Sequence, residues 1–290
     1  MDAQNITIPD GQMALVDAVL AVAAKPVIVV MLTAVPLDLT PLLSNPKVGA
    51  IMHAGQPSAQ GQGIGDVIFG KKVPAGRMIQ TVYPAEYAAQ ISIFDFNMRP
   101  GPSLFPRPDC TAKTGCPLGT NPGRTYRFYT GKAVVPFGFG LSYTTFSYKV
   151  TGAPATVSLS PHLPRLLARA KQGFVSVADA DAAGPATSFK ISVTNTGTRD
   201  ADDVVLGFLT PPGAGTNGVA KKVLFGFERV FVPAGATVDV ILYPEFTDLA
   251  HVRPDGVRVA NEGTFKATFG VEESAHLGMG FAEHTFAAHL

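Results

Sequence analysis

The sequence contains no tryptophan, only two cysteines and few charged residues, which make up 16% of its 290 positions. Its 23 Lys and Arg almost balance its 22 Asp and Glu, so the formal net charge is +1 and no basic surface is available for nucleic acid or an anionic membrane. The longest apolar run, residues 26–37, is too short to cross a bilayer. We therefore expect neither a nucleic acid nor a membrane as a partner.

The start of the chain also lacks a secretory signal. Residues 1–9 are polar and the first basic residue is Lys25, so we expect the chain to begin inside a longer protein. Apolar residues make up 46% of the sequence, which is enough for a sizeable core and excludes a disordered chain. At roughly 150 residues per domain, the length predicts about two domains.

The two cysteines, Cys110 and Cys116, lie close together in a segment flanked by Pro and Gly. No further Cys and no His stands at the spacing of a zinc site, so we expect no metal there. A disulfide between them would imply an oxidising compartment, whereas two free thiols would suit a reducing one. We favour the disulfide because the flanking residues predict a surface loop.

The first part of the sequence switches between helical and strand patterns. Residues 9–24 predict an amphipathic helix capped by Asp10, and residues 27–32 predict a strand buried on both faces. A short helix at 39–43, a strand at 48–53 and a glycine-rich helix at 57–70 follow. This order of elements predicts an α/β layer with a parallel sheet.

The pattern changes after residues 91–136, where Pro and Gly are dense and no period is visible, as in a functional loop or an interdomain connection. Apolar residues then alternate with polar ones, first at Phe189, Ile191 and Val193 and again within 238–242 and 265–269. Short alternating strands separated by turns predict a β-sandwich, which we expect to be stable without the α/β part. Residues 151–186, rich in Ala, Pro and Ser, predict an insertion or a mobile loop within it.

Catalytic signatures are absent: the sequence has no HExxH, no GxSxG and no Walker loop, and GQGIG (61–65) lacks the spacing of a dinucleotide loop. Four carboxylates in or near the α/β part are the remaining candidates for acid/base chemistry: Asp38, Asp66, Glu86 and Asp95. A glycosidase needs two carboxylates flanking one bond, and sequence spacing does not supply that geometry. We assign no catalytic, cofactor-binding or metal-binding residue and expect no cofactor.

Two smaller features have a functional and a structural interpretation. Asn5-Ile6-Thr7 is an N-glycosylation sequon, which acts only if the protein enters the secretory pathway. Arg124, Tyr126, Arg127 and Tyr129 form a basic-aromatic cluster. It could line a sugar cleft, but we favour cation–π packing of the long loop onto the domain boundary.

Several long strings are specific enough to point to one family. They include NITIPDGQ (5–12), KPVIVVMLTAVPLDL (25–39), NPGRTYRFYTG (121–131) and VVPFGFGLSYTTFSY (134–148). These strings resemble the C-terminal α/β sandwich of glycoside hydrolase family 3, and they look most like its fungal β-xylosidase branch. VLFGFERVFVPAG (223–235) and EGTFKATFG (262–270) resemble the fibronectin type III-like domain that closes such enzymes.

The resemblance implies an α/β fold followed by an all-β fold. It places a partial α/β sandwich with a parallel sheet at 1–95 and a long irregular connecting loop at 96–138. A fibronectin type III-like, immunoglobulin-like β-sandwich follows at 139–290, with the insertion at 151–186. The implied activity is that of a retaining exo-glycosidase in xylan degradation. Such an enzyme releases terminal xylose from xylo-oligosaccharides or xylan. The resemblance also implies that the intact protein is secreted.

In that family a barrel domain carries the nucleophile, and the acid/base glutamate precedes an Asp-Arg pair that aligns here with Asp2-Ala3. The resemblance therefore implies that both catalytic carboxylates lie outside these residues. It also implies that the chain is inactive alone and docks on the barrel domain. The alternative that we keep is a non-catalytic carbohydrate-binding or protein-docking module.

Overall fold

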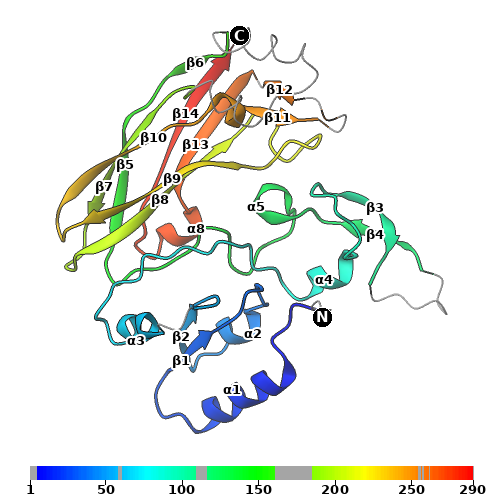
Figure 1. The fold of residues 1–290 in the computed structure, drawn as a ribbon, viewed down its shortest axis with the longest axis vertical. Coiled ribbons are helices and arrows are strands. Elements are labelled where there is room, and N and C mark those ends of the chain that lie inside the picture. Colours follow the sequence, from blue (N-terminus) through cyan, green and yellow to red (C-terminus); the bar gives the residue numbers. More distant parts are fainter. Residues whose placement is uncertain are drawn as a thin grey trace. The chain divides into compact units, whose positions relative to one another are not determined.

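The computed structural model describes residues 5–57, 61–108, 116–160, 185–253, 256, 258–260 and 262–289. They form two compact units (Figure 1). The first unit comprises Met1–Lys72 and Met78–Phe137, and the second comprises Val73–Arg77 and Gly138–Leu290. Mixed helices and sheets are therefore present, as the sequence predicted.

The first unit begins with α1 (Asp10–Val22), β1 (Val27–Met31), α2 (Thr40–Leu43), β2 (Val48–His53) and α3 (Gln62–Ile68). Strands β1 and β2 pair in parallel, with Val30 opposite Met52. Their apolar side chains share a small core with Leu39 and Leu42, and Met13 and Val16 of α1 pack against it. The predicted helices and strands of this part are therefore present.

Two details of this part differ from the prediction. Pro9 occupies the N-cap of α1 and Asp10 is its first helical residue, so Asp10 does not cap the helix with its side chain. Strand β1 is not buried on both faces, since Ile28 is 46% exposed. Within the described residues β1 and β2 form a sheet of two strands, which leaves β1 little cover.

The rest of the first unit contains α4 (Glu86–Gln90), β3 (Gly101–Pro106), β4 (Leu118–Asn121) and α5 (Thr125–Phe128). Strands β3 and β4 form an antiparallel pair within the segment that the sequence predicted to be irregular. An isolated antiparallel bridge joins Val82 to Val135, and Val82 is completely buried. Residues 96–137 are thus part of the first unit's own structure.

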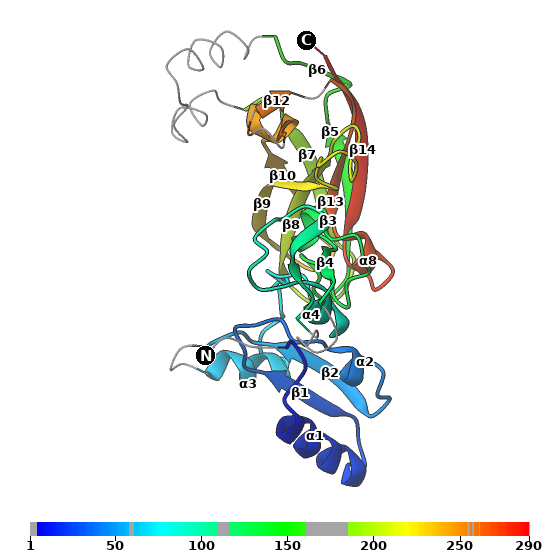
Figure 2. The ribbon, with the colours of Figure 1, turned by 90° about the vertical axis from the view of Figure 1, so that its right-hand side faces the viewer.

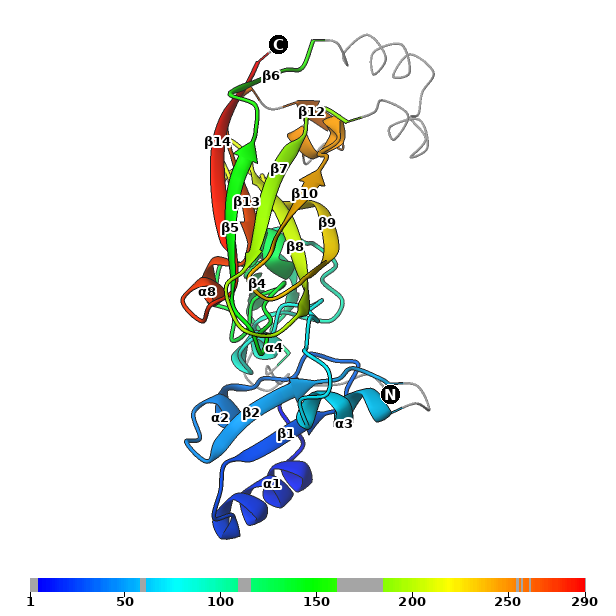
Figure 3. The ribbon, with the colours of Figure 1, turned by 90° about the vertical axis from the view of Figure 1, so that its left-hand side faces the viewer.

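The described part of the second unit contains a three-stranded and a five-stranded sheet (Figures 2 and 3). The first has the order β10 (Thr237–Leu242), β7 (Phe189–Asn195), β5 (Phe146–Gly152). The second has the order β6 (Thr156–Ser158), β14 (Phe281–His289), β13 (Gly263–Gly270), β8 (Ala201–Thr210), β9 (Val223–Val232). The described part of the second unit also contains four short elements: η2 (Phe246–Leu249), β11 (Ala250–Val252), β12 (Arg258–Ala260) and α8 (Glu272–Ala275).

The two sheets bury one common core, and its residues are those that alternate in the sequence. Phe189, Ile191 and Val193 of β7 and Phe265 and Phe269 of β13 are completely buried in it. Phe189 lies at the centre of an aromatic cluster, with ring centroids 5.5–5.8 Å from three neighbouring phenylalanines. The predicted period-two strands are therefore confirmed, together with the side that each presents to the core.

A short segment from the N-terminal half of the chain also belongs to the second unit. We call this segment, Val73–Arg77, the strap. Val73 packs against the core of the second unit and Ala75 is buried. The sequence placed these residues in a domain spanning 1–95, because nothing in the local pattern marks a change of unit. Most of the predicted insertion at 151–186 lies outside the described residues.

None of the helices in the described ranges is long and apolar enough to cross a membrane.

Candidate functional site

Asn5 and the pair Cys110 and Cys116 are the residues predicted for glycosylation and for a disulfide. Asn5 is exposed, and the Thr7 hydroxyl donates a hydrogen bond to its Oδ1 at 3.0 Å. The sequon is thus on the surface, and its glycosylation stays a prediction. Cys110 lies outside the described residues, so its bond to Cys116 also stays a prediction.

Asp38, the first of the four candidate carboxylates, lies in the loop after β1 and is 8% exposed. Its Oδ1 accepts hydrogen bonds from the backbone N–H of Thr40 at 2.8 Å and the Thr40 hydroxyl at 2.6 Å. Its Oδ2 accepts the N–H of Ala85 at 2.9 Å. The carboxylate therefore accepts the N–H of the first residue of α2 and ties this loop to the segment before α4, which is a structural role.

Asp95 is also buried and is surrounded by donors. Burial opposes its ionisation, but a hydrogen bond from the Asn97 N–H, further bonds from Ser103 and Asn121 and the charge of Arg124 together hold its pKa below the ordinary value. The Asn97 bond measures 2.9 Å. A carboxylate held ionised by several donors is a poor proton donor at neutral pH.

The other two candidates lie on helices. Asp66 of α3 accepts a hydrogen bond from Gln62 at 3.0 Å and lies 3.9 Å from the Lys71 ammonium. Glu86 is the first residue of α4, where a negative charge favours the helix N-terminus. In the described part of the chain, no group of three or more His, Cys, Asp or Glu side chains could hold a metal ion.

A cluster of three tyrosines lies in the first unit. The rings of Tyr83 and Tyr87 stack with centroids 4.0 Å apart, and Tyr129 meets both rings edge-on at 4.9 and 5.4 Å. Tyr87 and Tyr129 are buried, and Ile91 completes the cluster. Tyr129 was singled out from the sequence, but Tyr83 and Tyr87 were not. Their spacing of four positions, with Pro84 between them, was the available signal.

The phenols of this cluster are neutral at physiological pH. Burial raises the pKa of Tyr83, and burial followed by the neighbouring Tyr83 raises the pKa of Tyr87. The pKa of Tyr129 is also raised, first by burial and then by the negative charge of Glu86. These hydroxyls can therefore donate and accept hydrogen bonds but do not serve as phenolates.

The tyrosine hydroxyls hold the turn that precedes α5. The Thr125 N–H donates to the Tyr83 hydroxyl at 2.6 Å, and the Tyr87 hydroxyl donates to the Gly123 carbonyl at 3.3 Å. Thr125 has a φ of 62°, a conformation that a β-branched residue rarely adopts. Gly123 also has a positive φ, and a Cβ there would lie 2.3 Å from the Phe128 carbonyl oxygen. The tyrosines thus stabilise a strained turn.

The residues of the predicted basic-aromatic cluster contact different partners. Arg124 hydrogen-bonds the Asp95 carbonyl through Nη2, while its Nε is buried without a partner among the described residues. Arg127 lies 5.3 Å from the Phe128 ring centroid, and Tyr126 stacks on Phe137 at 4.4 Å. These contacts are internal to the first unit, and packing onto the domain boundary stays a prediction.

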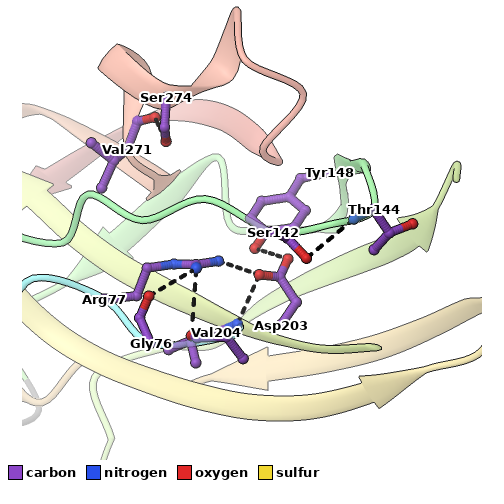
Figure 4. A network of polar contacts seen from close by, with 10 residues as sticks. Gly76, Arg77, Ser142, Thr144, Tyr148, Asp203, Val204, Val271 and Ser274 are labelled. Atoms are coloured by element: carbon purple, nitrogen blue, oxygen red, sulfur yellow. Dashed lines mark hydrogen bonds and ion pairs between the residues drawn. The ribbon is translucent and has the colours of Figure 1, made fainter. Parts of the chain in front are cut away.

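The second unit contains a buried polar network that the sequence analysis missed (Figure 4). Arg77 of the strap forms an ion pair with Asp203 of β8, whose side chain is completely buried. The Tyr148 hydroxyl of β5 donates to Asp203 Oδ2 at 2.6 Å, and Figure 4 shows both side chains pointing toward this carboxylate. The available signal was the register of β8, since Ala201, Asp203 and Val205 alternate on its inner side.

Comparisons with known proteins decide the family. Residues 1–143 match the family model of the glycosyl hydrolase family 3 C-terminal domain. The exo-1,4-beta-xylosidase xlnD of Aspergillus awamori is 31% identical over 280 residues, which are 96% of this chain and 32% of that protein. The chain belongs to glycoside hydrolase family 3. A probable exo-1,4-beta-xylosidase of Aspergillus clavatus is 34% identical over 281 residues, with the same coverage.

Two solved structures share the fold of this chain. An exo-beta-xylosidase (XlnD) in complex with a xylobiose aziridine probe has a TM-score of 0.79 and 27% identity, covering 100% of this chain and 34% of that one. A beta-D-glucoside glucohydrolase of Trichoderma reesei shares the fold, with a TM-score of 0.68, 21% identity and coverage of 99% and 37%. The relatives are glycosidases, and the chain spans about a third of the length of the curated relatives it matches.

Proposed function

We propose that this chain forms the C-terminal part of a β-xylosidase-like enzyme that releases terminal xylose from xylo-oligosaccharides. The observation that carries the proposal is the identity of 31–34% to exo-1,4-beta-xylosidases over almost the whole chain. The xylobiose-type probe in the similar solved structure supports the same substrate class.

We further propose that these 290 residues do not hydrolyse xylosides alone. Retaining hydrolysis needs a carboxylate nucleophile and a second carboxyl group that donates a proton. The buried candidates Asp38 and Asp95 are instead held by backbone and side-chain donors, which supports a structural role for both.

An aryl β-xyloside assay tests this proposal. The purified, monodisperse chain is compared with an active full-length Aspergillus exo-1,4-beta-xylosidase at equal molar concentration, and an aryl β-glucoside is measured in parallel. We expect release of the aryl group only from the full-length enzyme. Turnover of either substrate by the chain itself would show that a working carboxylate pair lies within these residues and would refute the second proposal.

We assign the second unit to the fibronectin type III-like, immunoglobulin-like class of β-sandwich. Two sheets that share one apolar core, antiparallel except for the parallel pair β6–β14, support this assignment. The first unit would then be the partial α/β sandwich of the family, and its parallel pair β1–β2 supports that reading.

Secretion of the intact protein is part of the same proposal. The exposed Asn5 and the Cys110–Cys116 pair supply two independent tests in protein from a eukaryotic secretory host. We expect a mass shift on enzymatic deglycosylation that is abolished by Asn5→Gln, and no free thiol without reduction. An unmodified Asn5 together with two titratable thiols would refute an extracellular history.

The first unit also carries an apolar patch that we propose as the docking surface for the family's barrel domain. The patch consists of Ile93, Phe94, Phe96 and Leu104, which are 62–85% exposed. Large apolar side chains that are this exposed support an interaction surface.

Calorimetric titration of the chain with a separately expressed barrel domain from an Aspergillus relative tests the docking surface. Phe96→Ser is expected to weaken binding at least tenfold. Leu15→Ser on α1 is a matched control, because Leu15 is 67% exposed and lies outside the patch. Equal affinity of the two variants would refute the assignment of this surface.

A further inference from the structure

The strap, Val73–Arg77, is built into the second unit although the residues on both sides of it belong to the first unit. The chain therefore passes between the units after Lys72, after Arg77 and again after Phe137. Val73 packs against the core formed by the two sheets, and Ala75 is 8% exposed. The strap thus supplies buried surface that residues 138–290 do not contain themselves.

The charge of Arg77 is the feature that fixes the strap in place. Asp203, its ion-pair partner, has a completely buried side chain, and Arg77 itself is only 11% exposed. The other bonds that the structure gives this carboxylate come from neutral donors, the Tyr148 hydroxyl and the Val204 N–H. A buried carboxylate without a cation is strongly unfavourable, so the second unit depends on a residue that arrives with the strap.

The backbone of the second unit leaves room for the strap at Gly140. A Cβ at this position would lie 2.4 Å from the Gly76 carbonyl oxygen and 3.0 Å from Arg77 Nη1. Arg77 Nη1 also makes hydrogen bonds of 3.4 Å to the carbonyls of Ala75 and Gly76, so the strap is curled around its own guanidinium (Figure 4). The close approach of the strap to Gly140 and the curl of the strap backbone indicate that the strap packs in a specific position on the second unit.

We propose that the second unit binds the strap as an intrachain peptide ligand, with Asp203 as the recognition residue for the Arg77 guanidinium. The stability of the β-sandwich then depends on the presence of the strap. This differs from the expectation that the sandwich is stable without the α/β part, because the buried carboxylate would otherwise have no counter-charge. The proposal is independent of whether the chain is active or what it binds.

Hydrogen exchange of the full-length chain, read by mass spectrometry in β5, β7 and β8, tests the proposal. Arg77→Met keeps an unbranched, flexible stem and removes the guanidinium with its charge, and we expect exchange in these strands to accelerate at least tenfold. The matched control is Arg229→Met, because Arg229 forms an exposed pair with Asp202, the residue next to Asp203. We expect the control to change exchange less than twofold.

A double variant separates recognition of the charge from loss of packing. In Arg77→Met/Asp203→Asn no unpaired charge is buried, so exchange in β8 is expected to be at least tenfold slower than in Arg77→Met alone. The proposal is overturned if Arg77→Met affects only peptides covering the strap, or if the double variant exchanges as fast as Arg77→Met.

If Arg77→Met yields no folded protein, Arg77→Lys is measured by hydrogen exchange in its place. It keeps the positive charge but loses the planar fork of the guanidinium, and it is compared with Arg229→Lys. Faster exchange of β8 in Arg77→Lys supports the proposal, and equal exchange in the two variants overturns it.

Discussion

Replacing Asp248 by Asn should change how the stability of the chain depends on pH. Asp248 lies in η2, where its carboxylate accepts the Glu245 N–H at 2.8 Å and the Glu245 carboxylate accepts the Asp248 N–H. Burial raises the pKa of Asp248 to about 6, and the negative charge of Glu245 adds to the rise although the Glu245 N–H opposes it. The ordinary pKa of an Asp is about 3.9.

The sign and the size of the effect follow from these two values. Between pH 4 and pH 6 the folded protein holds a proton that the unfolded chain releases, so stability falls as the pH rises through this window. The contribution of the protonated Asp248 to the free energy of unfolding is fully present below the pKa of the unfolded chain and is lost above about pH 6. A rise of about two pKa units corresponds to ~3 kcal/mol, which partial exposure of the side chain reduces to about 1–2 kcal/mol.

Urea unfolding at several pH values between 4.5 and 7.5 measures the effect. We expect the wild-type chain to lose about 1–2 kcal/mol relative to Asp248→Asn as the pH rises across this range, because the Asn cannot ionise. Asp239→Asn is a control that should leave the pH dependence unchanged in this range. Hydrogen bonds from Lys190 and Ser192 lower the pKa of Asp239, so its contribution is lost only as the pH falls below about 4. Parallel pH profiles for the wild type and Asp248→Asn would refute the reasoning.

Three substitutions test other parts of the structure by urea unfolding. Phe189→Ala empties the centre of the aromatic core and should cost ~3–5 kcal/mol, against under ~1 kcal/mol for the exposed Phe227→Ala; similar losses would contradict the described core. Asp38→Ala leaves three donors without their acceptor and should cost ~2–4 kcal/mol, whereas Asp66→Ala should cost under ~0.5 kcal/mol, and the reverse order would argue against the assigned role. Thr125→Gly should raise the free energy of unfolding by up to ~1 kcal/mol by relieving a positive φ; a gain from Thr125→Ala as well would show that strain is not the cause.

The strands of the second unit could be predicted because their signal is local. A strand that is buried on one side must place apolar residues at every second position, so Phe189, Ile191 and Val193 identify both the strand and its inner face. The same argument holds for Phe265 and Phe269. Partner strands and their order depend on contacts between distant residues, and a period carries no information about them.

The antiparallel pair β3–β4 could not be predicted for a different reason. Pro102 and Pro106 interrupt the alternation, and the pairing shifts its register between them. A proline cannot donate to a ladder, so such a strand has few hydrogen bonds and no clear period. The pair is held in part by a contact outside it, since the Asn121 amide at the end of β4 donates to the Asn97 backbone carbonyl at 2.7 Å.

The candidate carboxylates show why function was harder to read than fold. An Asp that caps a helix and an Asp that transfers a proton have the same identity in the sequence, and only their donors distinguish them. For Asp38 one of these donors, Ala85, lies 47 positions away along the chain. For Asp203 the decisive partner, Arg77, lies 126 positions away. Pairs at such separations belong to the fold as a whole. Asp38, which a search for catalysis selects, is therefore in this chain a residue that joins distant segments, as is Asp203, which such a search passes over.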